Sequence, residues 1–183
     1  MALRLARQWT GHQGIIVTEA AYHGNTSAVT EVSPSSFKKG SLPEHVHVIP
    51  ISQMPEQADP SAWFADQVRA GVARLDALGY GCAALLVDSI FSSDGVYAAP
   101  AGFLKPAVEW LQAQGALLIA DEVQPGFGRT GTGMWGFARH QVTPDVVTMG
   151  KPMGNGFPMA GLAAREELLA ALNEDVGYFN TFG

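Results

Sequence analysis

The chain has 183 residues and a hydrophobic content of 47%, which is enough for one domain with a packed core. The formal net charge of −6 and the lack of any basic cluster argue against a nucleic-acid surface and against binding to an anionic membrane. Every apolar run is far shorter than the ~20 residues of a membrane span, and the N-terminus lacks the apolar core of a signal peptide. The single cysteine, Cys82, excludes an internal disulfide. We therefore expect a soluble, cytoplasmic protein.

The first predicted elements are the end of a helix and a short strand. Residues 1–9 have the apolar pattern of the last turns of a helix, which ends by Gly11. The β-branched run at residues 14–18 predicts a strand, and polar groups follow it at residues 19–24. This strand therefore delivers polar side chains at its carboxyl end.

Residues 25–57 are rich in Ser, Pro and Gly and predict a loop region with one short strand. In that strand, His45 and His47 alternate with valines. Two histidines without a third ligand at a recognisable spacing favour an exposed strand face over a metal site, so no metal is predicted.

A long helix is predicted after this region. Asp59 is the expected N-cap, Pro60 takes the first helical position, and Gly79 ends the helix. The apolar face of this helix is formed by Phe64, Val68, Val72, Leu75 and Leu78.

Strands and helices alternate along the rest of the chain. Strands are predicted over residues 82–87, 116–120, 145–149 and 159–164, and helices over residues 101–114 and 165–173. Cys82 begins the first of these strands and is expected to be a reduced thiol in the core. The alternation favours parallel pairing with right-handed crossovers, so we expect an α/β fold: a three-layer α/β/α sandwich with a mostly parallel sheet.

Two charged residues stand at the carboxyl ends of two of these strands. Asp121 directly follows the run 116–120, and Lys151 follows the run 145–149 after one glycine. In open parallel sheets, ligands bind at the carboxyl ends of the strands. An acid and a lysine placed there match pyridoxal phosphate, which needs a lysine for an imine and an acid at its pyridinium nitrogen. An Asp121 that caps a turn, with a solvated Lys151, explains the same spacing equally well.

The sequence around these two residues carries a longer signature. The motifs are ADEVQPGFGRTGTGMWGF at 120–137, PDVVTMGKPMGNGFPMA at 144–160, AYHGNT at 21–26 and NTFG at 180–183. Together they resemble class III aminotransferases, the pyridoxal-phosphate enzymes of fold type I, over nearly the whole chain. Within this class, GKPMGNG is similar to the branch that contains alanine-glyoxylate aminotransferases and the related phospho-lyases.

The resemblance implies two catalytic residues. Lys151 would form the internal aldimine with pyridoxal 5′-phosphate and, once released by the incoming amine, would shuttle the proton at the substrate carbon. Asp121 would stay charged beside the ring nitrogen, so that the ring can withdraw electrons from that carbon.

The same resemblance implies a set of cofactor-binding residues besides Asp121 and Lys151. Tyr22 would stack on the ring, Val123 would lie against a ring face, and Gln124 would donate to the phenolic oxygen. Thr181 would reach the phosphate bound by the neighbouring subunit, which implies a homodimer. His23 belongs to this set through its motif; a lone histidine before a glycine is more often a turn or packing residue, so it is kept out of the catalytic set.

Some residues near these motifs allow two interpretations. Asp88 stands where the family usually has a glutamate beside the cofactor, and a carboxylate that caps its own loop is the alternative. Glu122 has a potential structural partner in Arg129. Trp135 and Phe137 fit core or interface positions better than substrate contacts.

The resemblance also implies what the family has outside this stretch. A phosphate-binding loop precedes the first helix in family members, and a small domain follows at the C-terminus, so residues 1–183 are expected to be a partial large domain. The implied function is transamination between an amine or amino acid and an oxo acid. A phospho-lyase acting on a phosphorylated amine, or a non-catalytic remnant of such an enzyme, remains the alternative.

Overall fold

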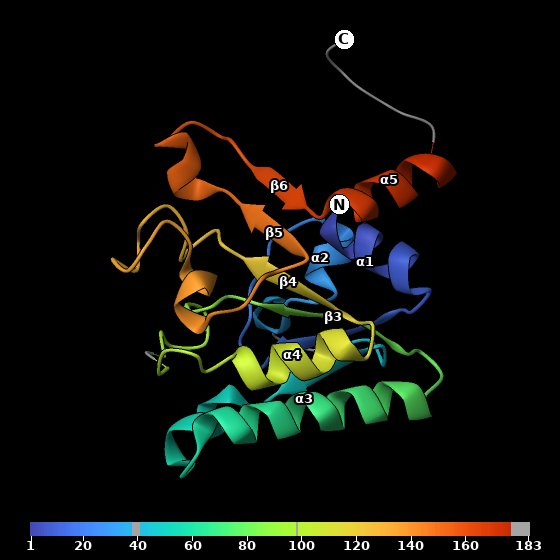
Figure 1. Ribbon diagram of the computed structural model, residues 1–183, viewed down its shortest axis with the longest axis horizontal. Helices are drawn as coiled ribbons and strands as arrows, with labels where there is room; N and C mark the ends of the chain where they lie inside the picture. Colours follow the sequence, from blue (N-terminus) through green and yellow to red (C-terminus); the bar gives the residue numbers. More distant parts are fainter. Residues whose placement is uncertain (38–40, 98, 177–183) are drawn as a thin grey trace.

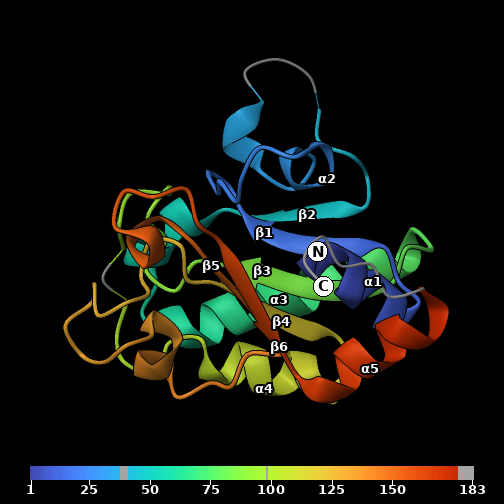
Figure 2. The ribbon, with the colours of Figure 1, turned by 90° about the horizontal axis from the view of Figure 1, so that it is seen from above.

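Six short segments form one sheet in the computed structural model, which describes residues 1–37, 41–97 and 99–176. The strands are β1 (Gly14–Thr18), β2 (Val46–Ile49), β3 (Cys82–Val87), β4 (Leu117–Asp121), β5 (Val146–Met149) and β6 (Gly161–Ala164). They lie in the order β2-β1-β3-β4-β5-β6, as Figure 2 shows from above. All neighbours are parallel except β5 and β6. The mostly parallel α/β sheet is therefore confirmed.

Helices cover both faces of this sheet (Figure 1). The α-helices are α1 (Ala2–Thr10), α2 (Ser27–Thr30), α3 (Pro60–Ala77), α4 (Lys105–Ala113) and α5 (Glu166–Asp175). The short 3-10 helices are η1 (Pro34–Ser36), η2 (Ile51–Glu56), η3 (Gly136–His140) and η4 (Lys151–Gly154). Helices α3 and α4 pack on one face, and α1 and α5 pack on the other. The three-layer sandwich is confirmed.

Strand alternation explains why the chain has two cores. Ile16 faces α3 and α4, whereas its neighbour Ile15 faces α1, because successive strand side chains point to opposite faces. Every residue of β1, β3 and β4 is buried, as expected for parallel strands covered on both sides. These strands therefore read as continuous apolar runs in the sequence.

The order of the strands also sets where a ligand can bind. The chain leaves β1 to form β2 on one side and later forms β3 on the other side of β1. The carboxyl ends of β1 to β5 all lie at one edge, because these strands are parallel. A crevice is expected at this edge where the direction of strand addition reverses.

Most predicted element ends agree with the structure, and α3 shows why. Asp59 caps α3 by accepting hydrogen bonds from the amides of Ser61 at 3.1 Å and Ala62 at 3.0 Å. At the far end, Gly79 has a φ of 79°, a left-handed conformation that favours glycine. The cap and the terminating glycine were both read correctly from the sequence.

Two predicted elements begin too early. Helix α4 starts at Lys105 rather than at Ala101, because Gly102 has a φ of 79°, which is incompatible with a helix. Strand β6 starts at Gly161 rather than at Met159, because Gly161 pairs with Met149, the last residue of β5, and residues before it have no strand opposite. The residue types alone did not predict where this helix and this strand begin.

The prediction of an exposed histidine face on β2 was wrong. His45 and His47 are half-buried, because α3 and Tyr80 cover this edge strand. A Cβ atom on Gly71 of α3 would come within 2.6 Å of His47 Cδ2, so the imidazole lies directly against the helix backbone. Among the described residues, no group of three or more His, Cys, Asp and Glu side chains is arranged to hold a metal ion.

Cys82 is a free, buried cysteine, as expected for a core thiol. Burial raises the pKa of its thiol to about 12, so the reactive thiolate is strongly disfavoured. None of the helices in the described ranges has the length and apolar character needed to cross a membrane.

We predict that His140 makes the chain sensitive to mild acid. Its ring is fully buried, Nε2 donates to the Ser89 carbonyl oxygen at 2.9 Å, and Nδ1 has no partner among the described residues. Burial lowers the pKa of His140 below its usual 6.5, so the unfolded chain takes up the proton first as the pH falls. Stability should therefore drop below pH ~6.5, by up to about 1.4 kcal/mol per pH unit from this group. Urea unfolding between pH 7.5 and 5.5 measures the slope.

The variant His140→Gln keeps a donor for the Ser89 carbonyl but cannot titrate. Its pH slope should be smaller than that of the parent chain but not zero, because burial also lowers the pKa of His45 and of His47. An unchanged slope in this variant would contradict the assignment.

Candidate functional site

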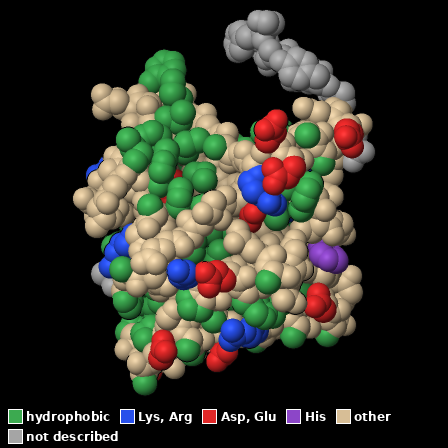
Figure 3. Space-filling model, viewed as in Figure 1, with side chains coloured by type: hydrophobic (Ala, Val, Ile, Leu, Met, Phe, Trp, Pro, Cys, Tyr) green, Lys and Arg blue, Asp and Glu red, His purple; other side chains and the backbone are tan. Residues whose placement is uncertain are grey.

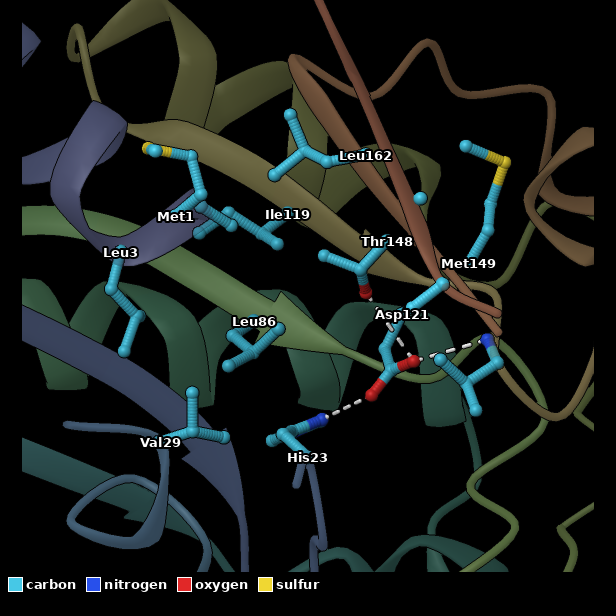
Figure 4. A pocket seen from close by; sticks show the side chains of 14 residues that line it. Met1, Leu3, His23, Val29, Leu86, Ile119, Asp121, Thr148, Met149 and Leu162 are labelled. Carbon is cyan, nitrogen blue, oxygen red and sulfur yellow. Dashed lines mark hydrogen bonds and ion pairs between the residues drawn. The ribbon is translucent and has the colours of Figure 1, made fainter. Parts of the chain in front are cut away.

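A buried acid–histidine pair lies at the carboxyl edge of the sheet. Strand β4 ends on Asp121, and the loop after β1 brings in His23. His23 Nδ1 lies 2.7 Å from Asp121 Oδ2, and the two side chains are only 4% and 8% exposed (Figure 4). The pair joins segments 98 residues apart in the sequence. A buried carboxylate needs such partners, because leaving its oxygens without donors would be costly.

The other oxygen of Asp121 is held from two directions. Oδ1 accepts a hydrogen bond from the backbone amide of Val123 at 3.1 Å and a longer one from the Thr148 hydroxyl at 3.4 Å. Thr148 lies beside Asp121 because the two residues are paired between β4 and β5. Asp121 therefore caps its own turn, as one interpretation expects, and also contacts His23; its role at a cofactor ring stays a prediction.

The predicted site residues that the structure describes line one cavity of about 320 Å³. Four loops contribute to it, each following one of the strands β1, β3, β4 and β5. The predicted residues in its lining are Tyr22, His23, Asp121, Val123, Gln124 and Lys151. Thr181 lies outside the described residues. The structure thus brings six separately inferred side chains to one place, while their role in binding stays a prediction.

Lys151 enters this cavity from a strained turn. Its φ of 44° is left-handed, which is unfavourable for a residue with a Cβ atom. The turn is closed by the Met153 amide, which donates to the Gly150 carbonyl at 3.1 Å. Non-glycine residues held in this conformation occur often at functional sites, where the surrounding structure maintains the strain.

Two side chains could hold a flat ring in this cavity. Tyr22 lines the cavity and is 47% exposed, so part of its surface is open to a ligand. Val123 is half-buried and lies against the turn of Lys151, since a Cβ atom on Gly150 would be 3.6 Å from a Val123 methyl group. These residues come from different loops, and both line the cavity.

His23 has one polar atom that lacks a partner. Its Nε2 is buried and has no hydrogen-bond partner within the part of the chain that the structure describes. An orphaned buried nitrogen is uncommon and is often explained by a missing ligand or water. The exposed aromatic ring, the buried carboxylate, the amine and this nitrogen together fit a polar, planar group such as pyridoxal phosphate.

Asp88 lines the same cavity but is held by its own loop. Its oxygens accept hydrogen bonds from the Ile90 amide at 2.9 Å, from the Ser92 amide at 3.0 Å and from the Ser92 hydroxyl. Burial raises the pKa of Asp88 above its usual value, and these donors oppose the change. The capping interpretation of Asp88 is therefore observed, and the side chain also borders the cavity.

The expected pairing of Glu122 with Arg129 is not found. The buried Glu122 carboxylate instead accepts from the amides of Gly136 at 2.8 Å and Phe137 at 2.9 Å, and Arg129 is exposed. Backbone amides satisfy the carboxylate without a cation. Trp135 and Phe137 stack with ring planes 5° apart, and Phe137 packs on the core, in line with its expected structural role.

A second, mostly apolar cavity of about 460 Å³ also has His23 and Asp121 in its lining (Figure 4). Figure 4 shows Met1, Leu3, Val29, Leu86, Ile119 and Leu162 around it. His23, Asp121 and Thr148 form its polar border. Sequence reasoning missed Thr148 at this site, although the expected pairing of the two neighbouring strands was a usable signal.

The sequence matches the family described as Aminotransferase class-III over residues 1–183. It is 37% identical to the alanine–glyoxylate aminotransferase 2-like protein of Drosophila melanogaster, over all of this chain and 40% of that protein. This chain thus spans less than half the length of that relative.

Solved structures share the fold. A phospholyase from Arthrobacter in complex with phosphoethanolamine is 39% identical, with a TM-score of 0.87 over 99% of this chain and 44% of that one. Taurine:2-oxoglutarate aminotransferase from Bifidobacterium kashiwanohense, in complex with PLP and glutamate, is 26% identical, with a TM-score of 0.78 over 96% of this chain and 42% of that one.

We predict that Glu122→Gln loosens the loop between β4 and η3. A glutamine has one acceptor oxygen for two backbone donors, so one of the amides of Gly136 and Phe137 would face an NH₂ group. The free energy of unfolding should fall by about 1–3 kcal/mol, and residues 125–135 should be cleaved faster in limited proteolysis. Glu109→Gln on α4 is the matched control, because its contact with Lys105 is an exposed pair at 3.9 Å. Equal effects of the two substitutions would refute the prediction.

Proposed function

Because the chain belongs to the class-III aminotransferase family, we propose that its carboxyl-edge cavity binds pyridoxal 5′-phosphate through Lys151 and serves transamination between an amine or amino acid and an oxo acid. One observation supports this proposal: predicted residues from the loops after β1, β4 and β5 line a single cavity, with the amine and the buried carboxylate both present. The chain spans less than half of its relatives, so the activity belongs to the proposal for the whole protein.

Asp121 is proposed to hold a positive charge at the ring nitrogen. When bound, pyridoxal phosphate supplies an electron-withdrawing ring that acidifies the bond between the substrate carbon and its hydrogen. The carboxylate of Asp121 keeps a proton on the ring nitrogen by its negative charge. His23 orients this carboxylate by donating from Nδ1 to Oδ2, and the Val123 amide fixes the other oxygen. Fixed donors on both oxygens leave little freedom for the carboxylate to rotate.

Lys151 is proposed to move the proton at the substrate carbon. Its Nζ would take up and return this proton as a general base. The strained turn determines the direction in which the side chain leaves the backbone. Tyr22 and Val123 would hold the ring from different loops, and Gln124 would donate its amide hydrogen to the phenolic oxygen.

A phospho-lyase reaction on a phosphorylated amine is the second candidate. It is favoured by the 39% identity and the TM-score of 0.87 to the Arthrobacter phospholyase. This reaction would use the same lysine and would differ in the group that leaves the substrate. A non-catalytic remnant is less consistent with the joint presence of Asp121, Gln124 and Lys151 in one cavity.

A homodimer is part of the proposal. Phe157 and Met159, in the connection between η4 and β6, are 69% and 48% exposed. Figure 3 shows hydrophobic side chains gathered in this part of the molecule. An exposed apolar surface of this kind is suited to a contact with a second copy. Thr181 is proposed to reach the phosphate bound by the neighbouring subunit.

We predict that borohydride reduction in the presence of pyridoxal phosphate labels Lys151. Reduction makes the lysine–cofactor bond permanent, and peptide mapping by mass spectrometry locates it. Lys151→Ala should abolish the label, whereas Lys105→Ala on α4 should leave it unchanged, because Lys105 does not line the cavity. A label on Lys105 in place of Lys151 would rule out the assigned lysine.

We predict that the products distinguish the two candidate reactions. A transaminase incubated with an amino donor and an oxo acid forms one new amino acid for each donor consumed. A phospho-lyase releases inorganic phosphate from phosphoethanolamine without any oxo acid. Lys151→Ala should lower either rate by about 10²–10⁴-fold, because it removes the base. Rates that do not exceed those of Lys151→Ala in both assays would contradict the proposed function.

A further inference from the structure

A five-residue segment connects the end of β1 to the cavity. Residues 19–23 follow Thr18 and end on Tyr22 and His23. Several hydrogen bonds hold this segment: the Glu19 amide donates to the Ile49 carbonyl, and the His23 amide donates to Ser33 Oγ. The amide and the hydroxyl of Ser35 both donate to the Ala21 carbonyl, and the Glu19 carboxylate accepts from the Ser52 amide. Its position therefore decides where the aromatic ring and the imidazole stand.

Asp94 fastens the same segment from the opposite side. It lies in the loop after β3, 76 residues away from Thr18 in the sequence. Oδ2 accepts a hydrogen bond from the Thr18 hydroxyl at 2.7 Å, and Oδ1 accepts one from the Ala20 amide at 2.8 Å. Bonds to an ionised acceptor are stronger than neutral ones. A single side chain thus holds both ends of the bend where β1 turns toward the cavity.

No described residue besides Asp94 accepts from the Thr18 hydroxyl or the Ala20 amide. Thr18 is only 2% exposed, so its hydroxyl has little access to water. Removal of the Asp94 carboxylate would leave a buried donor unsatisfied, which costs more than the net gain of an ordinary hydrogen bond.

The loop that carries Asp94 also forms part of the cavity wall. It begins at Asp88, and both Asp88 and Ser93 line the cavity. The loop is anchored in the core, because the amides of Asp94 and Val96 both donate to the carbonyl of the fully buried Phe91. Asp94 therefore connects the segment that carries Tyr22 and His23 to the loop after β3, which the core holds in place.

The charge of Asp94 depends on these contacts. Burial raises the pKa of the carboxyl group, and the donors on Thr18 and Ala20 oppose that change. The neighbouring Glu19 carboxylate raises the same pKa, and His23 lowers it. The hydrogen bonds from Thr18 and Ala20 therefore favour the ionised form against burial and the Glu19 charge.

We propose that Asp94 is a positioning residue, which holds the segment 19–23 so that Tyr22 and His23 face the cavity containing Asp121 and Lys151. It acts through its bonds to Thr18 and Ala20 and does not itself line the cavity. Its effect on cofactor binding rests on the proposed function, whereas its effect on His23 can be observed in the chain without cofactor.

Four variants test the proposal. Asp94→Asn removes the charge and one acceptor, so that an NH₂ group faces a donor. Thr18→Val is close in shape but lacks the hydroxyl, and Thr18→Ser restores it. Asp76→Asn, an exposed aspartate on α3, is the matched control for the loss of charge.

The first measurement is NMR of the histidine-labelled chain without cofactor, combined with hydrogen exchange of its backbone amides. A His23→Gln variant identifies the signal of the Nδ1 proton that is bonded to Asp121. Asp94→Asn should broaden or shift this signal and accelerate exchange in residues 19–24 by about tenfold, with little change in α3. Thr18→Val should cause a smaller change in the same direction, and Thr18→Ser and Asp76→Asn should resemble the parent chain.

The second measurement is titration with pyridoxal phosphate, followed by visible absorbance. The cofactor concentration at half-saturation should rise in the same order across the variants, by about tenfold for Asp94→Asn. A parent chain that binds no cofactor would refute the proposed function, while the changes at His23 would still support the positioning role.

Two outcomes would overturn the positioning role. One is an Asp94→Asn variant whose His23 signal and exchange in residues 19–24 equal those of the parent chain. The other is an acceleration of exchange that is as large in α3 as in residues 19–24, because Asp94 would then serve only global stability. If Asp94→Asn does not fold, Thr18→Val gives the deciding comparison, since it keeps the carboxylate and the Ala20 bond.

Discussion

A carboxylate buried at the edge of a parallel sheet must be surrounded by hydrogen-bond donors, and Asp121 shows how this chain meets that requirement. Its oxygens receive donors from the loop after β1, from its own turn and from β5. Each donor must come from a segment that the sheet holds in place, so the burial of one acid imposes an arrangement on three neighbouring segments. Two of these segments, the loop after β1 and the turn after β4, also line the cavity.

Other buried carboxylates near the cavity also accept hydrogen bonds from neighbouring segments. Asp88, Asp94 and Glu122 are also withdrawn from water, and burial raises the pKa of each. Asp88 accepts from two amides of its own loop, and Asp94 accepts from the Thr18 hydroxyl at the end of β1 and from the Ala20 amide. Glu122 accepts from the first two amides of η3. Buried carboxylates thus hold the backbone near the cavity in place by accepting hydrogen bonds from it. Loops without regular structure gain defined positions in this way, which a binding site built on loops requires.

The carboxylates that hold loops differ in their surroundings from the two groups that we propose to react. Asp121 and Lys151 are the two groups with chemistry suited to the family's cofactor, and both lie at strand ends. Lys151 is exposed on a strained turn, whereas Asp121 is nearly enclosed. In the proposed roles, the amine of Lys151 would exchange partners and would benefit from access, and the carboxylate of Asp121 would benefit from fixed donors that keep its charge in one place. The loops supply both environments because they leave the sheet at one edge.

The sequence alone determined the strands, the three layers, the family resemblance and the candidate set from Tyr22 to Lys151, because apolar periodicity and short motifs are local properties of a chain. Only the tertiary structure decided which donors meet which acids. The pairs His23–Asp121 and Thr18–Asp94 join residues 98 and 76 positions apart, and Glu122 bonds backbone amides rather than Arg129. Such partners are set by strand order and register, which place distant loops side by side at one edge, and no local pattern in the sequence contains that information.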